Sequence, residues 1–332
     1  MFTNKHTISI AAVLTAVSLL AGCGSTAAGE AAESGKLSIV CTVFSGYDWV
    51  RQILGSNADN ADITYLLESG IDLHNFQPTA DDIIRISDCD LFIYAGGESD
   101  KWVEDALAGA VNKDMRVINM LEAVGDNAKT EEIKEGMMPE EEEEEDEGEE
   151  EEEEYDEHVW LSVRNAKLIC SDIADELRKL DPANAEAYSA NLAAYLSELD
   201  KLDSDFAEML GAVSEKTLIF GDRFPFRYFT EDYGLDYYAA FAGCSAETEA
   251  SFETIVFLSQ KLDELGCGTV YTIEGSDKSV AQTVINSTQA KDQTIAELDS
   301  LQSVNRAQTD AGATYISLMR ENYEVLRETL SK

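Results

Sequence analysis

Strand-like and helix-like stretches alternate along the first third of this chain. Short runs rich in apolar and β-branched residues predict four strands, at 36–44, 61–67, 90–94 and 116–119. Stretches with apolar residues at helical spacing predict helices between them, at 47–54, 79–87 and 101–110. Thr79 precedes the second of these helices as its expected N-cap. Because strands alternate with helices, we expect a parallel sheet with crossover connections.

The last third repeats this pattern. Strands are predicted at 216–220, 237–242, 269–273 and 294–298, and helices at 224–232, 251–265, 277–285 and 314–330. Between the two thirds lies a helical region, in which Asp181-Pro182 separates a helix at 162–180 from one at 184–210. The second helix contains neither Gly nor Pro and would be roughly 40 Å long at about 1.5 Å per residue. It is either a surface helix or a connection between lobes. The expected fold is α/β, with two Rossmann-like lobes that contain parallel sheets and are joined by a long rigid helix.

The N-terminus has the pattern of an export signal. Lys5 precedes the apolar stretch Ile8–Leu20, which is too short to span a bilayer comfortably. Leu20-Ala21-Gly22-Cys23 resembles a bacterial lipobox, which implies cleavage before Cys23 and lipidation of its thiol. The alternative is an ordinary signal peptide with an incidental cysteine. No later segment has the length and apolarity of a transmembrane helix.

These boundaries predict the organisation of the whole chain. We expect a signal peptide at 1–22, a flexible tether at 23–35, an N-terminal lobe at 36–136, an acidic loop at 137–157, a helical region at 158–214 and a C-terminal lobe at 215–332.

The charge is strongly acidic and concentrated in one segment. The formal net charge is −42, which disfavours nucleic acid and anionic membrane as partners because both would repel the chain. Sixteen of the 66 acidic residues lie between Glu140 and Glu157. Such a run cannot bury a core. It is either a solvated insert or a loop that collects cations through carboxylate oxygens.

The cysteines do not form a recognisable metal motif. Five follow Cys23, and none forms a CxxC pair, which argues against a thiolate zinc cluster. A disulfide is possible in an exported protein, but the spacing names no pair. Cys41 and Cys89 lie in or beside predicted strands and are interpreted as buried apolar thiols.

Two histidines are the principal candidates for chemistry. The chain has three, and His6 lies in the expected signal peptide. His74 and His158 each follow acidic residues and precede apolar ones, which suggests one site built from two segments. Neutral imidazole is the commonest protein ligand for divalent transition metals. Asp222 and Glu274 each follow a predicted strand, where open α/β sheets place their ligands.

These residues lie in motifs that resemble a known family. Asp72-Leu73-His74-Asn75-Phe76-Gln77-Pro78-Thr79 and Asp156-Glu157-His158-Val159-Trp160-Leu161 resemble the two histidine loops of the solute-binding lipoproteins of bacterial ABC transporters for zinc and manganese. Tyr233-Gly234-Leu235 and Ile273-Glu274 resemble its later ligand segments, so the resemblance covers almost all of the chain after Cys23.

The resemblance implies a receptor that is not an enzyme. It would be a lipid-anchored monomer on the extracytoplasmic face of the cell membrane. It would bind Zn²⁺, or secondarily Mn²⁺, through His74, His158, Glu274 and Asp222, and deliver it to an ABC permease and its ATPase. The long helix would allow only modest shifts of the lobes. Because histidine ligands must be neutral, uptake should weaken as the pH falls through roughly 6.5.

One position departs from the family pattern. Its third ligand, usually His or Glu, falls at Arg223, which offers no lone pair to a metal. Asp222, Glu247 or Glu249 could replace it, or Arg223 could pair with an acid such as Glu274. Two other function classes also stay open: a surface cation-binding or adhesion protein that uses the acidic tract, and a secreted metallo-hydrolase. The second needs a general base on an open metal site, and no HExxH motif is present.

Overall fold

The computed structural model describes residues 36–138, 154–245 and 249–330. The expected signal peptide, Cys23, the tether, most of the acidic tract and Glu247 lie outside these ranges. The described residues after Gly35 belong to one compact unit.

The N-terminal lobe is built on a four-stranded parallel sheet with the order β2-β1-β3-β4. Its strands are β1 (Leu37–Cys41), β2 (Ala61–Tyr65), β3 (Leu91–Tyr94) and β4 (Arg116–Asn119). The central strands are short apolar runs, as expected where helices cover both faces of a parallel sheet. The helices are α1 (Phe44–Leu54), α2 (Ala80–Asp88), α3 (Trp102–Ala108) and α4 (Met120–Ala123). Thr79 caps α2 as predicted, in a capping box with Asp82.

The C-terminal lobe has the same plan. Its sheet has the order β6-β5-β7-β8 and is also parallel. The strands are β5 (Thr217–Arg223), β6 (Asp236–Phe241), β7 (Thr269–Ile273) and β8 (Thr294–Leu298). The helices are α7 (Arg227–Tyr233), α8 (Phe252–Leu265), α9 (Ser279–Ser287), α10 (Arg306–Asp310) and α11 (Tyr315–Leu330). The pairing of β5 with β6 is irregular between Phe220 and Arg223, beyond the predicted strand end at Phe220.

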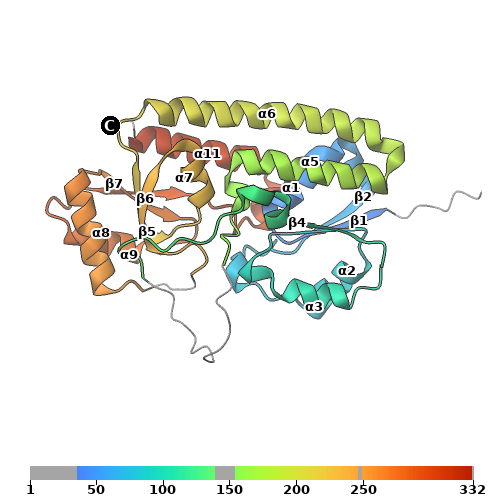
Figure 1. The fold of residues 1–332 in the computed structure, drawn as a ribbon, viewed down its shortest axis with the longest axis horizontal. Coiled ribbons are helices and arrows are strands. Elements are labelled where there is room, and N and C mark those ends of the chain that lie inside the picture. The colour runs from blue at the N-terminus through green and yellow to red at the C-terminus, as the bar shows by residue number, and fades with distance from the viewer. Residues whose placement is uncertain (1–35, 139–153, 246–248, 331–332) are drawn as a thin grey trace, which may run out of the picture. The chain divides into compact units, whose positions relative to one another are not determined.

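A long helix connects the lobes, as predicted. After α5 (Val163–Leu180), α6 (Ala185–Ala212) runs for 28 residues. At about 1.5 Å per residue it is about 42 Å long. It packs on α1 and α5 at one end and on α7 and α11 at the other (Figure 1). Because apolar side chains of α6 such as Leu199 and Phe206 are buried, the helix is part of the core that both lobes share.

The tryptophans and cysteines have structural roles. Trp49 and Trp160 are fully buried and Trp102 packs on Phe92, so all three serve packing. The five described cysteines are free thiols, and Cys41 and Cys89 are buried as predicted. Among the described residues, no helix combines the length and apolarity needed to cross a membrane.

Candidate metal centre

The two histidines occupy loops with the same local structure. In each, an aspartate two residues earlier accepts a hydrogen bond from the histidine backbone N–H. Asp72 Oδ1 accepts from His74 at 3.1 Å, and Asp156 Oδ1 accepts from His158 at 2.9 Å. A short 3-10 turn surrounds His74 at Leu73–Asn75, and another follows His158 at Val159–Leu161. The repeated Asp-x-His sequence therefore encodes a repeated turn that presents an imidazole.

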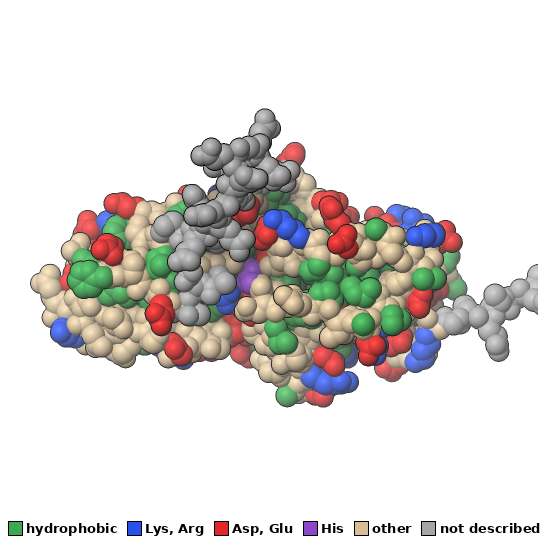
Figure 2. Space-filling view, turned by 90° about the horizontal axis from the view of Figure 1, so that it is seen from below, with side chains coloured by type: hydrophobic (Ala, Val, Ile, Leu, Met, Phe, Trp, Pro, Cys, Tyr) green, Lys and Arg blue, Asp and Glu red, His purple; other side chains and the backbone are tan. Residues whose placement is uncertain are grey.

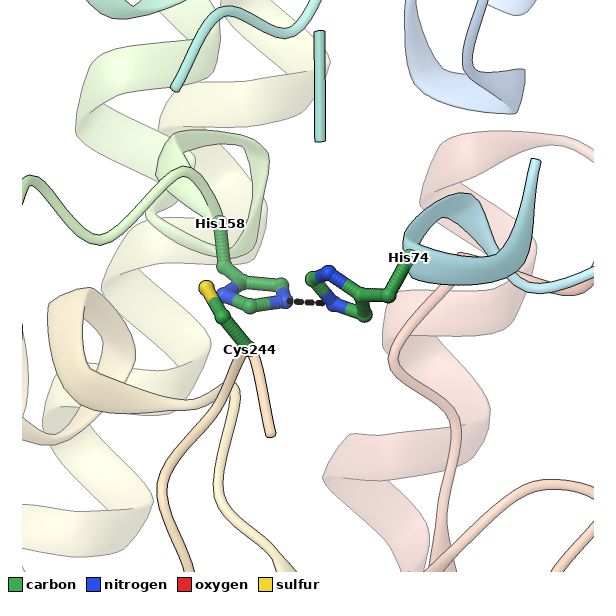
Figure 3. A group of neighbouring side chains, drawn as sticks. All are labelled: His74, His158 and Cys244. Atoms are coloured by element: carbon green, nitrogen blue, oxygen red, sulfur yellow. Dashed lines mark hydrogen bonds between the residues drawn. The ribbon is translucent and has the colours of Figure 1, made fainter. Parts of the chain in front are cut away.

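The structure brings His74 and His158 together, although 84 positions separate them. Their Nε2 atoms lie 3.3 Å apart and their ring centroids 5.3 Å apart (Figure 3). The His158 side chain is fully buried and that of His74 is 5% exposed. In the space-filling view, histidine is visible only as a small area of the surface (Figure 2).

Each imidazole is oriented by a carboxylate on its other nitrogen. His74 Nδ1 lies 3.0 Å from Glu157 Oε1 and 2.8 Å from Ser99 Oγ, and His158 Nδ1 lies 2.9 Å from Asp156 Oδ1. Since a carboxylate accepts hydrogen bonds, it favours the tautomer with the proton on Nδ1 and leaves the Nε2 lone pair free. This is the outer-shell arrangement typical of metal-binding histidines.

Two facing lone pairs repel each other unless a cation lies between them. Two nitrogens bound at about 2.05 Å to one tetrahedral zinc ion lie about 3.3 Å apart, which is the distance observed. In the metal-free protein a proton can take this place, with imidazolium at His158 donating to His74. Burial alone lowers the pKa of His158, but the adjacent Asp156 carboxylate outweighs it, and the net pKa is raised above 6.5.

Glu157 is a buried carboxylate that stays ionised. It accepts hydrogen bonds from the backbone N–H of Ser99 at 3.1 Å and from Ser99 Oγ. Burial alone would raise the pKa of Glu157, but the hydrogen bond and charge of His74 lower it overall. Gly97 permits this packing, because it has a positive φ of 80° and an added Cβ would lie 2.8 Å from Glu157 Oε2.

The structure adds Cys244, which sequence reasoning did not assign to the site. One candidate ligand atom each of His74, His158 and Cys244 lies within 4.8 Å of the others (Figure 3). Burial, and then the charges of Glu157 and Glu131, raise the pKa of the Cys244 thiol well above its usual value. The available signal was its place just after a strand, at the edge where parallel sheets put ligands.

Asp222 and Glu274 are engaged elsewhere and are not part of this group. Asp222 Oδ2 accepts a hydrogen bond from the Ile273 backbone N–H at 3.3 Å. Glu274 accepts four hydrogen bonds, from Ser300 N–H and Oγ at 2.7 Å each and from Gln302 N–H and Ser303 N–H. Removal from solvent, and then the charge of Asp299, raise the Glu274 pKa to about 7. Their coordination of a metal stays a prediction.

Arg223 pairs with an acid, which was one of the alternatives that the sequence left open, and this acid is Asp72. Its Nη2 atom donates to Asp72 Oδ2 at 2.5 Å rather than to Glu274. Its Nη1 atom also donates to the Ser245 carbonyl at 3.4 Å. The guanidinium thus links the His74 loop to the Cys244 loop. Glu249, another candidate for the third ligand, is exposed, and Glu247 lies outside the described residues.

The C-terminal end of the acidic tract is held beside the site by the segment at Thr130 and Glu131. Thr130 and Tyr155 form an antiparallel bridge, and the Glu131 N–H donates to the Glu154 carbonyl at 2.8 Å. Beyond this bridge the chain reaches the C-terminal lobe, where the Met138 N–H donates to the Ala240 carbonyl at 3.0 Å. The C-terminal end of the tract therefore carries Asp156 and Glu157, which orient the two imidazoles.

Comparison with known proteins gives a consistent family. The chain is 28% identical over 308 residues to the zinc-binding protein AdcA of Streptococcus pyogenes, which covers 92% of this chain and 58% of AdcA. It thus spans little more than half of that relative's length. It is 30% identical over 314 residues to the high-affinity zinc uptake system protein ZnuA of Bacillus subtilis, which covers 94% of each.

Solved structures agree with these relatives. The Zn(II)-bound ZnuA-like domain of Streptococcus pneumoniae AdcA superposes with a TM-score of 0.68 at 28% identity, over 90% of this chain and 100% of that one. The metal-dependent lipoprotein YcdH of Bacillus subtilis gives a TM-score of 0.69 at 26% identity, over 89% and 99%. Residues 39–329 match the model of the family described as zinc-uptake complex component A, periplasmic. The chain therefore belongs to this family, the zinc-uptake complex component A family.

Proposed function

We propose that this protein is the extracytoplasmic receptor of an ABC importer for a divalent transition metal. Zinc is the first candidate for this metal, and manganese is the second. The observation that carries the proposal is the pair of Nε2 atoms 3.3 Å apart, each on an imidazole whose Nδ1 faces a carboxylate. The names of the zinc-binding relatives support the same cargo.

The chemistry is capture and release. Glu157 and Asp156 keep the two imidazoles in the tautomer that binds metal, so an arriving ion finds His74 and His158 already oriented. The ion replaces the proton shared by the two Nε2 atoms, and this proton leaves to solvent. His74 and Cys244 belong to different lobes, so a modest lobe shift that separates them would weaken binding of the ion.

Delivery requires the protein to stay near its permease. A lipid on Cys23, together with the tether at 23–35, would keep the receptor at the membrane. The permease and its ATPase are proposed from the family, and the receptor itself would act as a monomer without catalytic activity. The lipobox resemblance and the family both support this arrangement.

The test is calorimetry of the metal-stripped protein with zinc and with manganese. We expect one tight site that is lost in His74→Ala and in His158→Ala. A variant that lacks Glu140–Glu153 should keep this site, because Glu154 and the bridge at Tyr155 remain. The preferred ion would identify the cargo.

A different result would point to a different function. Many weak sites that are unaffected by His74→Ala and are lost when the acidic tract is deleted would contradict the proposed receptor function. They would favour the cation-binding or adhesion protein considered from the sequence, with the tract as its binding element.

A further inference from the structure

The Cys244 loop is held closely against His158. Gly243 has no room for a side chain, because an added Cβ would lie 2.9 Å from the Phe224 carbonyl oxygen and 3.1 Å from His158 Cε1. The Cys244 backbone N–H donates to Glu131 Oε1 at 3.1 Å. The loop is therefore fixed from two sides, and the thiol lies beside the His158 imidazole (Figure 3).

Cys244 differs from the other described cysteines in its surroundings. The others are buried in the hydrophobic clusters of the two lobes: Cys41, Cys89, Cys170 and Cys267. Cys244 is partly exposed and belongs to none of these clusters, and its neighbours include two imidazoles. Apolar packing explains why the other four positions carry a cysteine, but it does not explain the cysteine at position 244.

A thiolate completes a zinc-like set of ligands. Around a tetrahedral zinc ion, a nitrogen and a sulfur ligand lie about 3.6 Å apart. The candidate ligand atoms here lie within 4.8 Å of one another, so the sulfur is close enough to join the imidazoles after a small movement of its loop. Thiolate and imidazole ligands suit zinc and its heavier congener cadmium, whereas manganese prefers oxygen ligands.

We propose that Cys244 is the third protein ligand of the cargo ion and makes the receptor selective for thiophilic divalent ions over manganese. This inference rests on the proposed function, because it names a ligand of the same site. On binding, the metal–sulfur bond forms as the S–H bond breaks, and the proton passes to solvent. Arg223, which cannot coordinate, holds the Cys244 and His74 loops together through Ser245 and Asp72.

Optical titration with Co²⁺ and Cd²⁺ detects the sulfur directly. We expect the metal-stripped protein to develop an ultraviolet thiolate-to-metal charge-transfer band that saturates at one equivalent. Cys244→Ser should lose this band, and its zinc affinity should fall at least about 100-fold, beyond the roughly 10–100-fold typical of losing an outer-shell partner. Its manganese affinity should change much less. Cys267→Ser, which removes a thiol outside the site, should behave like the unaltered protein.

The outcomes separate this inference from the proposed function. One tight zinc site without a charge-transfer band, and unchanged in Cys244→Ser, would overturn the inference and leave the receptor intact. Absence of any tight site in the unaltered protein would overturn the receptor itself. Because the band is measured on the unaltered protein, the test stands even if Cys244→Ser folds poorly.

Discussion

Arg223 and Asp72 form an ion pair that joins the two lobes directly beside the facing histidines. The Arg223 Nη2 atom lies 2.5 Å from Asp72 Oδ2, and both side chains are largely buried. Asp72 also caps the turn that presents His74. Burial alone would raise the pKa of Asp72, but the hydrogen bond and charge of Arg223 lower it overall, so this carboxylate stays ionised. Arg223, which stands at the third ligand position of the family, thus acts on the candidate metal site through Asp72.

Loss of this ion pair should loosen the site. In Arg223→Met, Asp72 keeps a buried charge without its partner, so the His74 turn is held less firmly. We expect zinc affinity to fall roughly 10-fold or more, as measured by competition with a chromophoric chelator. Arg306→Met is the matched control, because its ion pair with Glu68 is exposed and contributes at most about 1 kcal/mol. Equal effects of both substitutions would contradict a special role for Arg223.

Removal of the carboxylate that orients His74 should weaken binding without abolishing it. Glu157→Gln keeps the shape of the side chain but removes the charge that fixes the Nδ1 proton of His74. The expected loss in zinc affinity is about 10–100-fold, less than in His74→Ala. Glu98→Gln, an exposed acid on the neighbouring turn, should leave the affinity unchanged. If calorimetry finds Glu157→Gln equal to the unaltered protein, the orienting role is wrong.

Zinc binding should weaken with acid at a higher pH than the sequence alone suggested. The folded, metal-free protein raises the pKa of His158 above 6.5, so protons compete with zinc already above that pH. Affinity should fall about tenfold for each pH unit per displaced proton. Calorimetry in buffers of different ionisation enthalpy, between about pH 8 and about pH 6, measures the protons released.

The stability of the metal-free protein should change with pH in the opposite direction to the zinc affinity. A histidine whose pKa is raised by folding adds stability that is fully present below the unfolded pKa of about 6.5. That stability is lost as the pH rises through the higher folded pKa. The thermal stabilisation by zinc should therefore grow with pH over the same range. A stabilisation independent of pH would show that His158 does not exchange a proton for the metal.

A side chain at Gly243 should disturb both folding and binding. In Gly243→Ala, the Cβ would lie 2.9 Å from the Phe224 carbonyl oxygen, so the Cys244 loop must move away from His158. We expect a loss of about 1–3 kcal/mol in the free energy of unfolding, together with weaker zinc binding. Gly268→Ala is the matched control, because nothing lies within 4 Å of its added Cβ. Urea denaturation with and without zinc separates the two effects.

Much of the fold follows from local pattern. Each of the eight predicted strands overlaps an observed strand, because short apolar runs between turns are encoded locally. Helix ends were less accurate: α1 begins at Phe44 rather than Tyr47, and α7 begins at Arg227 rather than Phe224. Such boundaries depend on contacts with the sheet that periodicity does not record.

The histidine pair was predictable because each half of the site is a local motif. Asp72-Leu73-His74 and Asp156-Glu157-His158 each form their turn through a hydrogen bond between residues two positions apart. Cys244 was not predictable in this way, since no Asp-x-His motif marks it and the carboxylates of Glu247 and Glu249 drew attention to the same segment instead. The partner of Arg223 was missed for a related reason, because the irregular pairing after Phe220 alters where the end of β5 directs its side chains.

The sequence by itself determined two parallel sheets, the connecting helix and the two imidazoles, because periodicity and short-range hydrogen bonds are properties of neighbouring residues. Only the tertiary structure decided that His74 and His158 face each other, that Cys244 joins them and that Arg223 pairs with Asp72. These relationships join segments separated by between 84 and 170 positions, so they depend on how the lobes pack around α6. The coordination geometry is therefore a property of that packing.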